Sequence, residues 1–329
     1  MAQLLKRLSG GEALSLDESY LLAREILSGD LSDVAIAAAL TAMRCRGETA
    51  EEVAGFVKFA REVAVKVPLR VEAIDTAGTG GDGAGTINLS TAAAVVAAAA
   101  GARVLKHGNR SASGLFGSAD FMEAVGYNLD VGPEKAAEMV ERVGFAFVFA
   151  PKYHLAFARV APIRRQLPFR TIFNIVGPLA NPGLVKRQLT GVSERRLLDV
   201  VGGVASMLLD TALVVYGSGV DEVSAEGPTE VVEVRRGKTE RYVVTPEDFG
   251  VQKTPIPRAS SRVEAVALAL AGLRGEHREA MVAIAVNASA ALYVAGVARD
   301  YREGYGLAVN AIREGAAYRK LMEAVEASR

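Results

Sequence analysis

The feature that most constrains this chain is a glycine-rich run from Asp75 to Thr86, which reads DTAGTGGDGAGT. Glycines recur too often here for the interior of a helix or a strand. Glycine lets the backbone adopt positive φ and approach a ligand closely. Successive main-chain N–H groups in such a loop form a concave site that binds anions. The run therefore predicts an anion-binding loop rather than a regular element.

The segments on either side of the run support this interpretation. The apolar residues of 71–74 predict a short strand that leads into the loop. The alanine-rich stretch 91–100 predicts a helix, whose N-terminal dipole would add to an anion site. A strand, a glycine loop and a helix in this order indicate a phosphate-binding site.

The glycine run has two other interpretations. Such a run can be a flexible connection. It also fits the dinucleotide fingerprint G-x-G-x-x-G at Gly78, Gly80 and Gly83. That fingerprint requires a helix that opens at the third glycine and an acidic residue about twenty positions later. Here the helix signal begins only at Ser90, and position 103 is Arg. A phosphate loop of another kind fits better.

Composition indicates a globular chain with few candidates for other chemistry. Of its 329 residues, 50% are hydrophobic and 23% charged, and the formal net charge is zero. A neutral chain presents no broad basic field, so we expect no nucleic-acid partner. Cys45 is the only cysteine, which excludes an internal disulfide and a cysteine metal cluster. The N-terminus lacks a signal-peptide pattern, and the apolar stretches near 92–100 and 280–297 are too short or interrupted by polar residues. We therefore expect a cytoplasmic protein with no membrane partner.

The N-terminal 65 residues show helical patterns only. Ser15 with Glu18 and Thr49 with Glu52 form capping boxes, and Ser32 can cap a further helix. No strand pattern occurs before Val71. This part of the chain is expected to form a small helical unit.

Beyond Val71 the pattern alternates between strands and helices. Further strands are predicted at 103–106, 145–150, 211–216, 230–234 and 240–244. Helices are predicted at 133–143, 193–209, 261–272, 275–296 and 306–327. The proline-containing segment 159–191 has no regular pattern and could contribute to the helical unit. This alternation predicts an α/β domain with a largely parallel sheet, in which ligands gather at the carboxyl ends of the strands.

Three polar groups are candidates for chemistry at that edge. The loop from Lys106 to Arg110 could bind phosphate, although a solvated basic turn gives the same pattern. Asp221 and Glu222 could share a hard cation such as Mg²⁺, although a solvated acidic turn is the alternative. Four arginines crowd the segment 159–170, and one of them is expected to bind an anionic substrate.

Taken together, these motifs resemble the anthranilate phosphoribosyltransferase family, which joins anthranilate to phosphoribosyl pyrophosphate (PRPP) in tryptophan biosynthesis. The matching motifs run in family order over about half of the chain. They are Asp75–Asp82, Asn88–Thr91, Lys106–Arg110, Gly117–Asp120, Ala161–Arg165, Arg170–Pro182 and Gly219–Glu222.

The resemblance implies a fold of the nucleoside phosphorylase and phosphoribosyltransferase type. It consists of a small all-helical domain over 1–68, with a contribution from about 160–190, and a larger α/β domain with a mostly parallel central sheet over 69–329. It also implies a homodimer formed through the helical domain, and Mg²⁺ as cofactor.

The resemblance further assigns residues to three groups. PRPP would be bound by Gly78, Gly81, Asp82, Thr86, Asn88, Leu89, Ser90, Thr91, Lys106, His107, Gly108, Asn109 and Ser118. Anthranilate would be bound by Gly78, His107, Asn109, Arg164 and Pro178. Magnesium would be held by Ser90, Asp221 and Glu222. No side chain is implied as a dedicated acid or base, and Lys106 and the metal would stabilise the leaving group.

One departure from the family pattern lies in the phosphate-side loop. Many family members have a Ser-Ser-Lys-Ser-like run where this chain has Leu115 and Phe116, which puts side-chain contacts there in doubt.

Two rival functions share some of these features. Pyrimidine nucleoside phosphorylases are similar in fold, but they are longer and depart from Gly-Thr-Gly-Gly-Asp in the loop. A non-catalytic relative that binds nucleic acid would be expected to lose the polar motifs and gain a basic surface.

Overall fold

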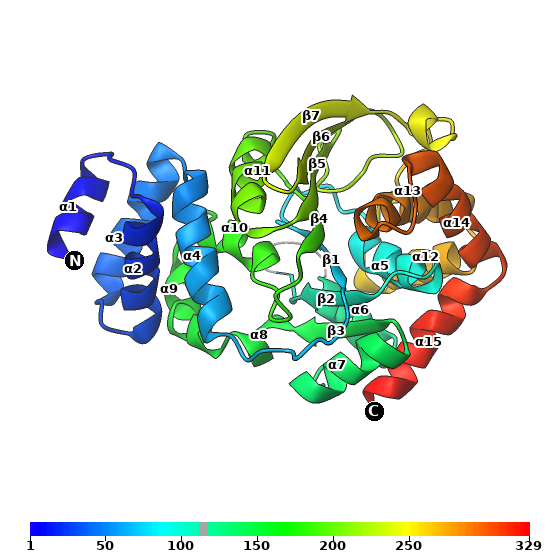
Figure 1. Cartoon of the computed structure of the whole chain (residues 1–329), viewed down its shortest axis with the longest axis horizontal. Coiled ribbons are helices and arrows are strands. Elements are labelled where there is room, and N and C mark those ends of the chain that lie inside the picture. Colours follow the sequence, from blue (N-terminus) through cyan, green and yellow to red (C-terminus); the bar gives the residue numbers. More distant parts are fainter. Residues whose placement is uncertain (112–116) are drawn as a thin grey trace.

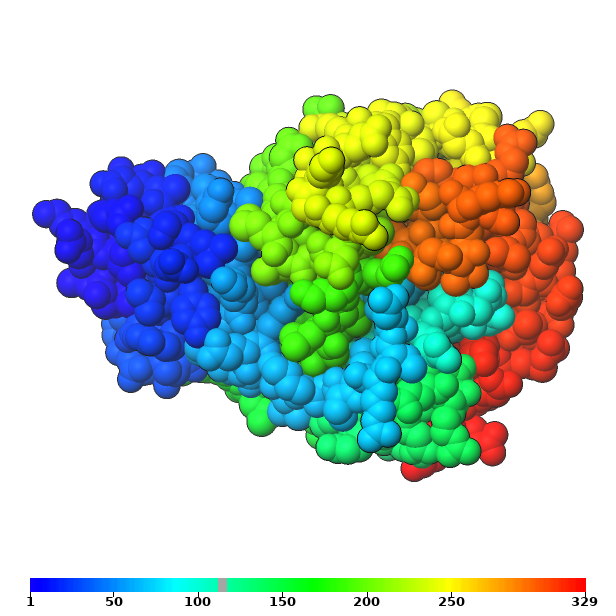
Figure 2. Space-filling view, viewed as in Figure 1, coloured from blue at the N-terminus to red at the C-terminus, as the bar shows by residue number. Residues whose placement is uncertain are grey.

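The computed structural model describes residues 1–111 and 117–329. The chain forms a small helical lobe, which carries the N-terminus, and a larger α/β lobe built around one sheet (Figure 1). The space-filling view shows the helical lobe projecting from one side of the larger lobe (Figure 2). The fold class expected from the sequence is confirmed.

Four helices begin the chain, and their starts follow the sequence signals. They are α1 (Ala2–Ser9), α2 (Leu16–Ser28), α3 (Asp33–Arg46) and α4 (Ala50–Val63). Both predicted capping boxes are present, at Ser15 and at Thr49, and the side chain of Ser32 accepts a hydrogen bond from the third residue of α3. These side chains satisfy N–H groups that a helix leaves unpaired at its start.

The larger lobe is organised by a single sheet of seven strands in the described residues, in the order β3-β2-β1-β4-β5-β6-β7. The strands are β1 (Ile74–Gly78), β2 (Val104–Gly108), β3 (Phe145–Phe149), β4 (Arg187–Gly191), β5 (Thr211–Gly217), β6 (Thr229–Arg235) and β7 (Lys238–Val244). The first five strands are parallel, whereas β6 and β7 are antiparallel. The carboxyl ends of β1, β2 and β5 therefore meet at one edge.

Helices cover both faces of this sheet (Figure 1). On one face α5 (Leu89–Ala99) packs against α13 (Arg278–Ala295), and on the other α11 (Leu197–Leu208) packs against β5, β6 and α4. The remaining helices are α6 (Ser118–Ala124), α7 (Pro133–Arg142), α8 (Ala150–Tyr153), η1 (Leu155–Arg159), α9 (Ala161–Gln166), α10 (Ile172–Leu179), η2 (Pro246–Phe249), α12 (Arg262–Leu273), α14 (Tyr301–Arg313) and α15 (Ala316–Ser328).

Two separate apolar clusters form the interior. One lies between the sheet and the helices α5, α12, α13, α14 and α15. The other joins α1–α4 to the opposite face of the sheet and includes Val160, Ile163, Ile172, Phe173 and Val176 from the α9–α10 region. A segment from the middle of the chain thus completes the interior of the helical lobe.

Several predicted boundaries were wrong, for identifiable reasons. The strand expected at 71–74 lies instead at Ile74–Gly78. Its buried residues Asp75 and Thr76 are polar, so the sequence pattern did not indicate a strand there. The segment 159–191 contains α9, α10 and β4, because Pro162 sits at a helix start, Pro178 is accommodated within a short helix, and Pro168 and Pro182 lie between the elements. The C-terminal region holds four helices rather than three, since Gly315 (φ 70°) separates α14 from α15.

One helix has the length and apolar composition of a membrane span. This helix is α13, and 78% of its apolar window is buried inside the structure. Its burial against α5, α12 and α14 identifies it as a core helix of the larger lobe.

A pair of glycines in α14 provides a test of this helix packing. A Cβ on Gly304 would lie 2.9 Å from the carbonyl oxygen of Ser289 in α13, whereas a Cβ on Gly306 would meet nothing within 4 Å. We expect Gly304→Ala to lower the free energy of unfolding by about 1–3 kcal/mol, because it overpacks the contact. Gly306→Ala is expected to raise it by about 0.5–1 kcal/mol, because alanine is the better helix former. Thermal and urea unfolding of the two variants measure both effects, and equal shifts would contradict the packing.

Candidate active site

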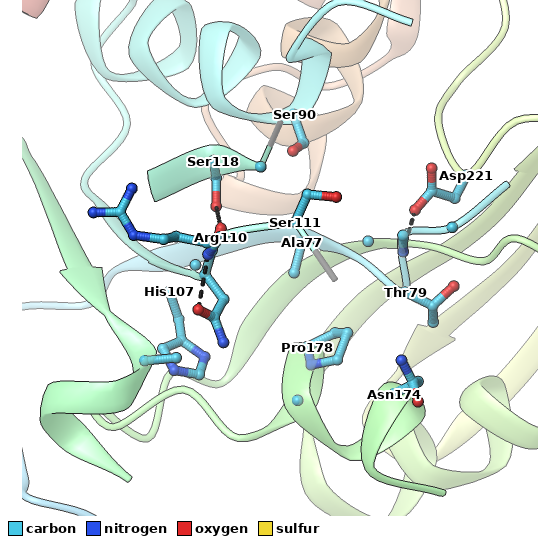
Figure 3. Close-up of a pocket in the computed structure, with 18 of the residues that line it drawn as sticks. Ala77, Thr79, Ser90, His107, Arg110, Ser111, Ser118, Asn174, Pro178 and Asp221 are labelled. Atoms are coloured by element: carbon cyan, nitrogen blue, oxygen red, sulfur yellow. Dashed lines mark hydrogen bonds between the residues drawn. The ribbon is translucent and has the colours of Figure 1, made fainter. Parts of the chain in front are cut away.

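A cavity of about 990 Å³ lies where the carboxyl ends of β1, β2 and β5 meet. The glycine loop, the start of α5 and the end of β2 line one part of it, and residues of η1, α9 and α10 line the other. Figure 3 shows Asn174 and Pro178 of α10 on one side of this space and Ser90 and Ser118 on the other. The helical lobe and the sheet thus both contribute to the walls.

The glycine loop enters this cavity in a conformation that only glycine adopts readily. Gly80, Gly81, Gly83 and Gly85 all have φ between 63° and 73°. The N–H group of Gly80 donates to Oδ2 of Asp221 at 2.7 Å, an interaction drawn in Figure 3. The first turn of the loop is therefore tied to the end of β5.

Lys106 does not lie on a solvated turn, which corrects one of the interpretations of its motif. It belongs to β2, its exposed fraction is 1%, and burial lowers its pKa. Its Nζ donates to the carbonyl oxygen of Thr76 and lies 3.3 Å from Oγ of Ser90. Among the described residues no carboxylate lies within ion-pair distance of Nζ. The buried cation is thus directed at the start of α5 without a direct counter-charge.

Asp75, the first residue of the glycine run, is a structural residue of β1. Its side chain is fully buried and accepts hydrogen bonds from the N–H group of His107 at 3.2 Å and from Nδ2 of Asn181 at 2.8 Å. Asn181 also donates to the carbonyl oxygen of Leu105. Burial raises the pKa of Asp75 to about 6. These bonds connect β1, β2 and the chain beyond α10 beneath the cavity.

Three carboxylates face the cavity near the glycine loop. Asp221 donates its N–H group to Oδ2 of Asp82, and Glu222 accepts a hydrogen bond from the N–H group of Ser90 at 3.1 Å. Burial raises the pKa of Asp221 and of Glu222, and the charge of Asp82 adds to the shift of Asp221. No arginine or lysine forms an ion pair with these three side chains in residues 1–111 and 117–329. The charges of Arg170 and Lys106 offset part of the cost of this burial without forming an ion pair, and a bound cation could offset more.

The donor set fits a magnesium ion that takes part of its coordination from substrate and water. Mg²⁺ prefers oxygen ligands and is bound by one or two carboxylates rather than by a complete protein cage. Asp221 and Glu222 supply carboxylate oxygens, and Ser90 supplies a hydroxyl beside them. No group of three or more His, Cys, Asp and Glu side chains in the described residues is arranged to enclose a metal by itself.

The opposite part of the cavity is aromatic and carries a half-buried arginine. The guanidinium of Arg164 lies 5.5 Å from the ring centre of Phe173, and its Nη2 lies 3.4 Å from Oδ1 of Asn174. Burial lowers the pKa of Arg164, and no carboxylate pairs with it in the described part of the chain. The ring of Phe157 packs edge-on against Phe173. This wall combines a flat apolar surface with one positive charge, which suits an aromatic acid.

Two buried histidines lie between these parts of the cavity. The ring centres of His107 and His154 are 5.0 Å apart, and both side chains are less than 7% exposed. Burial lowers the pKa of both, to about 4 for His154. Both imidazoles are therefore neutral near pH 7. Nε2 of His107 and both ring nitrogens of His154 lack a hydrogen-bond partner in the described residues.

The structure brings nearly all of the sequence-derived site residues to this one cavity. Those that line it are Gly78, Gly81, Asp82, Thr86, Asn88, Leu89, Ser90, Lys106, His107, Gly108, Asn109, Ser118, Arg164, Pro178, Asp221 and Glu222. Thr91 does not line it: its side chain is buried and donates to Oδ1 of Asn88. Leu115 and Phe116 lie outside the described residues. Of the four arginines in 159–170, Arg164 and Arg170 line the cavity.

The sequence analysis missed one group of lining residues. Ala150, Pro151, His154, Leu155, Phe157, Ala158 and Ala161 line the cavity from α8 to α9. Their position directly after β3 is a signal that could have identified them, because this strand also ends at the ligand-binding edge. Asn174 and Phe173 were missed because the sequence pattern predicted no helix over α10.

Comparison with known proteins identifies relatives over the whole chain. Residues 2–64 match the model of the glycosyl transferase family, helical bundle domain, and residues 70–318 match that of the glycosyl transferase family, a/b domain. The anthranilate phosphoribosyltransferase of Pyrobaculum islandicum is 84% identical over 329 residues, which is 100% of both chains.

Solved structures of relatives have the same fold. The crystal structure of anthranilate phosphoribosyltransferase from Thermus thermophilus is 39% identical, with a TM-score of 0.93 over 99% of both chains. The Saccharomyces cerevisiae enzyme, solved with PRPP and Mg and with 4-fluoroanthranilate, is 24% and 25% identical in the two alignments, with TM-scores of 0.88 and 0.87. Each alignment covers 99% of this chain and 98% of the yeast chain.

The buried imidazole of His154 predicts a specific loss of stability in acid. Its pKa is about 4 in the folded protein, against an ordinary value of 6.5. As the pH falls from 6.5 to 4, His154 is protonated in the unfolded chain but stays mostly neutral in the folded protein. This difference lowers the free energy of unfolding by about 2–3 kcal/mol. We expect His154→Phe to reduce this acid sensitivity, measured as the difference in Tm between pH 7 and pH 4.5. His277→Asn, at the exposed start of α13, is the control, and an equal change in both variants would refute the assignment.

Proposed function

Since the chain belongs to the anthranilate phosphoribosyltransferase family, we propose that it transfers the phosphoribosyl group of PRPP to the amino group of anthranilate. The products are N-(5-phosphoribosyl)anthranilate and pyrophosphate, and the reaction serves tryptophan biosynthesis. The observation that carries this function is the two-part cavity. Its glycine loop and Lys106 suit a phosphorylated sugar, and its aromatic wall with Arg164 suits an aromatic acid.

The main barrier to the reaction is the departure of pyrophosphate from C1 of the ribose. As the C1–O bond breaks, negative charge develops on the leaving oxygen. The ammonium group of Lys106 and the N–H groups of the glycine loop are fixed in place before the reaction, so they can stabilise this charge without reorganising. We assign the PRPP site to the glycine loop, the start of α5, the end of β2 and Ser118.

The attacking amine needs no dedicated base. An aromatic amine is neutral near pH 7, and its nitrogen lone pair is available to form the C1–N bond as pyrophosphate leaves. Arg164 pairs with the anthranilate carboxylate, while Asn109, His107 and Pro178 bound the ring. Holding the amine next to C1 provides the remaining acceleration through proximity. The displacement is loose, resembles an oxocarbenium ion and inverts the configuration at C1.

Ser90, Asp221 and Glu222 are the residues that would hold Mg²⁺. The ion, when bound, neutralises charge on the pyrophosphate group. Burial and neighbouring carboxylates raise the pKa of both Asp221 and Glu222, and a bound cation would offset both effects, which supports this assignment.

Family membership also supports proposals about organisation. We assign residues 1–68 to the helical domain, with a contribution from about 160–190, and residues 69–329 to the α/β domain. The helices α9 and α10, which pack with the N-terminal helices, support this division. A homodimer formed through the helical domain and a cytoplasmic location are further expectations that rest on the resemblance.

The function is tested by the decay of anthranilate fluorescence with purified protein, PRPP and MgCl₂. We expect the signal to decline only when all three are present, and chelation of the metal with EDTA to stop the decline. A folded protein that leaves anthranilate unchanged at every magnesium concentration would refute the function. Nucleoside phosphorolysis and nucleic-acid binding would then be assayed in that order.

Arg164 provides the test of the anthranilate site. Replacing Arg164 by Ala removes the cation that lies against Phe173, so the KM for anthranilate is expected to rise roughly ten- to hundredfold. The KM for PRPP is expected to change little. Arg165→Ala is the matched control, because this adjacent side chain is exposed and does not line the cavity. An unaltered KM for anthranilate would remove Arg164 from the site.

A further inference from the structure

Arg170 makes an unusual set of contacts at the entrance of the glycine loop. It lies between α9 and α10, and its guanidinium donates hydrogen bonds to the carbonyl oxygens of Thr79 and Gly80. It also donates to Oγ of Ser193 at 2.8 Å. Within the described residues it forms no ion pair with a carboxylate. Its hydrogen bonds thus go to the backbone of the loop, while its charge acts on Asp221 and Asp82 only from beyond ion-pair distance.

The N–H groups of the same two residues are also held, from the opposite side. The N–H group of Thr79 donates to the carbonyl oxygen of Gly191 at 2.9 Å, and that of Gly80 donates to Asp221 at 2.7 Å. Ser193 adds a further link, because its N–H group donates to Oγ1 of Thr79 at 2.9 Å. The N–H groups are therefore fixed by the sheet and the end of β5, while Arg170 fixes both carbonyl groups.

This anchoring matters because the loop can otherwise rearrange. Gly80 and Gly81 have φ of 63° and 69°, and glycine occupies the mirror-image conformations with similar ease. A rotated peptide would turn a carbonyl oxygen, which is partially negative, toward the cavity in place of an N–H group. An anionic ligand would be repelled by the carbonyl oxygen and bound by the N–H group.

We propose that Arg170 is a positioning residue for PRPP. It keeps the carbonyl groups of Thr79 and Gly80 turned away from the cavity, so that the N–H group of Gly80 stays on Asp221 and the N–H group of Gly81 is left for the ligand. The proposal rests on the function proposed above. Arg170 comes from the segment that completes the helical lobe, so the phosphate loop of one lobe is held by a side chain from the other.

A direct contact with substrate is the competing role, since Arg170 lines the cavity. Both terminal nitrogens of its guanidinium are already engaged, Nη1 by Gly80 and Ser193 and Nη2 by Thr79. A direct contact would require some of these bonds to break. The two roles differ in one consequence: only positioning predicts that the loop changes when the arginine is removed in the absence of substrate.

The test compares Arg170→Ala and Arg170→Lys with Arg159→Ala. Arg159 is the matched control: it comes from the same region and donates to the carbonyl oxygen of Leu31, but it lies outside the cavity. We expect Arg170→Ala to raise the KM for PRPP roughly ten- to hundredfold, as expected for lost hydrogen bonds to a charged group. The KM for anthranilate is expected to change less than about threefold. Arg170→Lys should recover part of the loss, and Arg159→Ala should leave the KM for PRPP unchanged.

Hydrogen exchange of the substrate-free protein gives a readout that does not depend on activity. The amide of Gly80, which shares a peptide group with the carbonyl of Thr79, is expected to exchange faster in Arg170→Ala than in the wild type, with unchanged exchange in Arg159→Ala. A raised KM for PRPP with unchanged exchange would overturn the proposal in favour of direct contact. An equal rise in KM in both alanine variants, together with a lower Tm, would reduce Arg170 to a stability role. If the wild type lacks transferase activity, the proposed function fails, while unchanged exchange in Arg170→Ala would separately refute the anchoring.

Discussion

The parallel pairing of β1 with both β2 and β4 determines where the polar groups of the cavity lie. Because β1 is central and its neighbours run in the same direction, the chain leaves all three strands at one edge. The glycine loop, Lys106 and the loop after β5 then converge without any long connection. The buried bonds of Asp75 to His107 and Asn181 reinforce this arrangement beneath the cavity. The order and direction of the strands therefore determine where the site lies, and the particular side chains determine its chemistry.

The charged groups of the cavity offset one another only in part. The carboxylates of Asp82, Asp221 and Glu222 lie near the glycine loop, Lys106 acts on Asp221 and Glu222 from beyond ion-pair distance, and Arg164 lies on the aromatic wall. None of these groups forms an ion pair with another in the described residues. Buried charges of this kind are costly in the absence of partners. Bound ligands that together supply phosphate groups, a metal ion and a carboxylate would lower this cost at each position. The same groups would then be fixed before reaction, as electrostatic catalysis requires.

The sequence predicted this site better than it predicted the elements that form it. The glycine loop, the capping boxes at Ser15 and Thr49 and the Asp221–Glu222 pair are local signals, and each was found where it was expected. By contrast β4 was missed, since it buries the polar residues Gln188 and Thr190, which are joined by a hydrogen bond that spacing does not reveal. Lys106 was ambiguous for a similar reason, because its burial depends on β1 and α5. The positions of His154 and Phe157 in the cavity could be predicted only by knowing that β3 ends at the same edge of the sheet as β1 and β2.

The packing of α9 and α10 against the N-terminal helices also bears on how the chain is made. The helices α1–α4 leave the ribosome first, but the side chains that complete their apolar interior follow about 100 residues later. At a synthesis rate of about 5–20 residues per second, this delay lasts roughly 5–20 seconds. During that time the helical lobe exposes a surface that its own residues cannot cover. The chain is therefore prone to aggregation during translation, from the synthesis of α4 until α9 and α10 have been made.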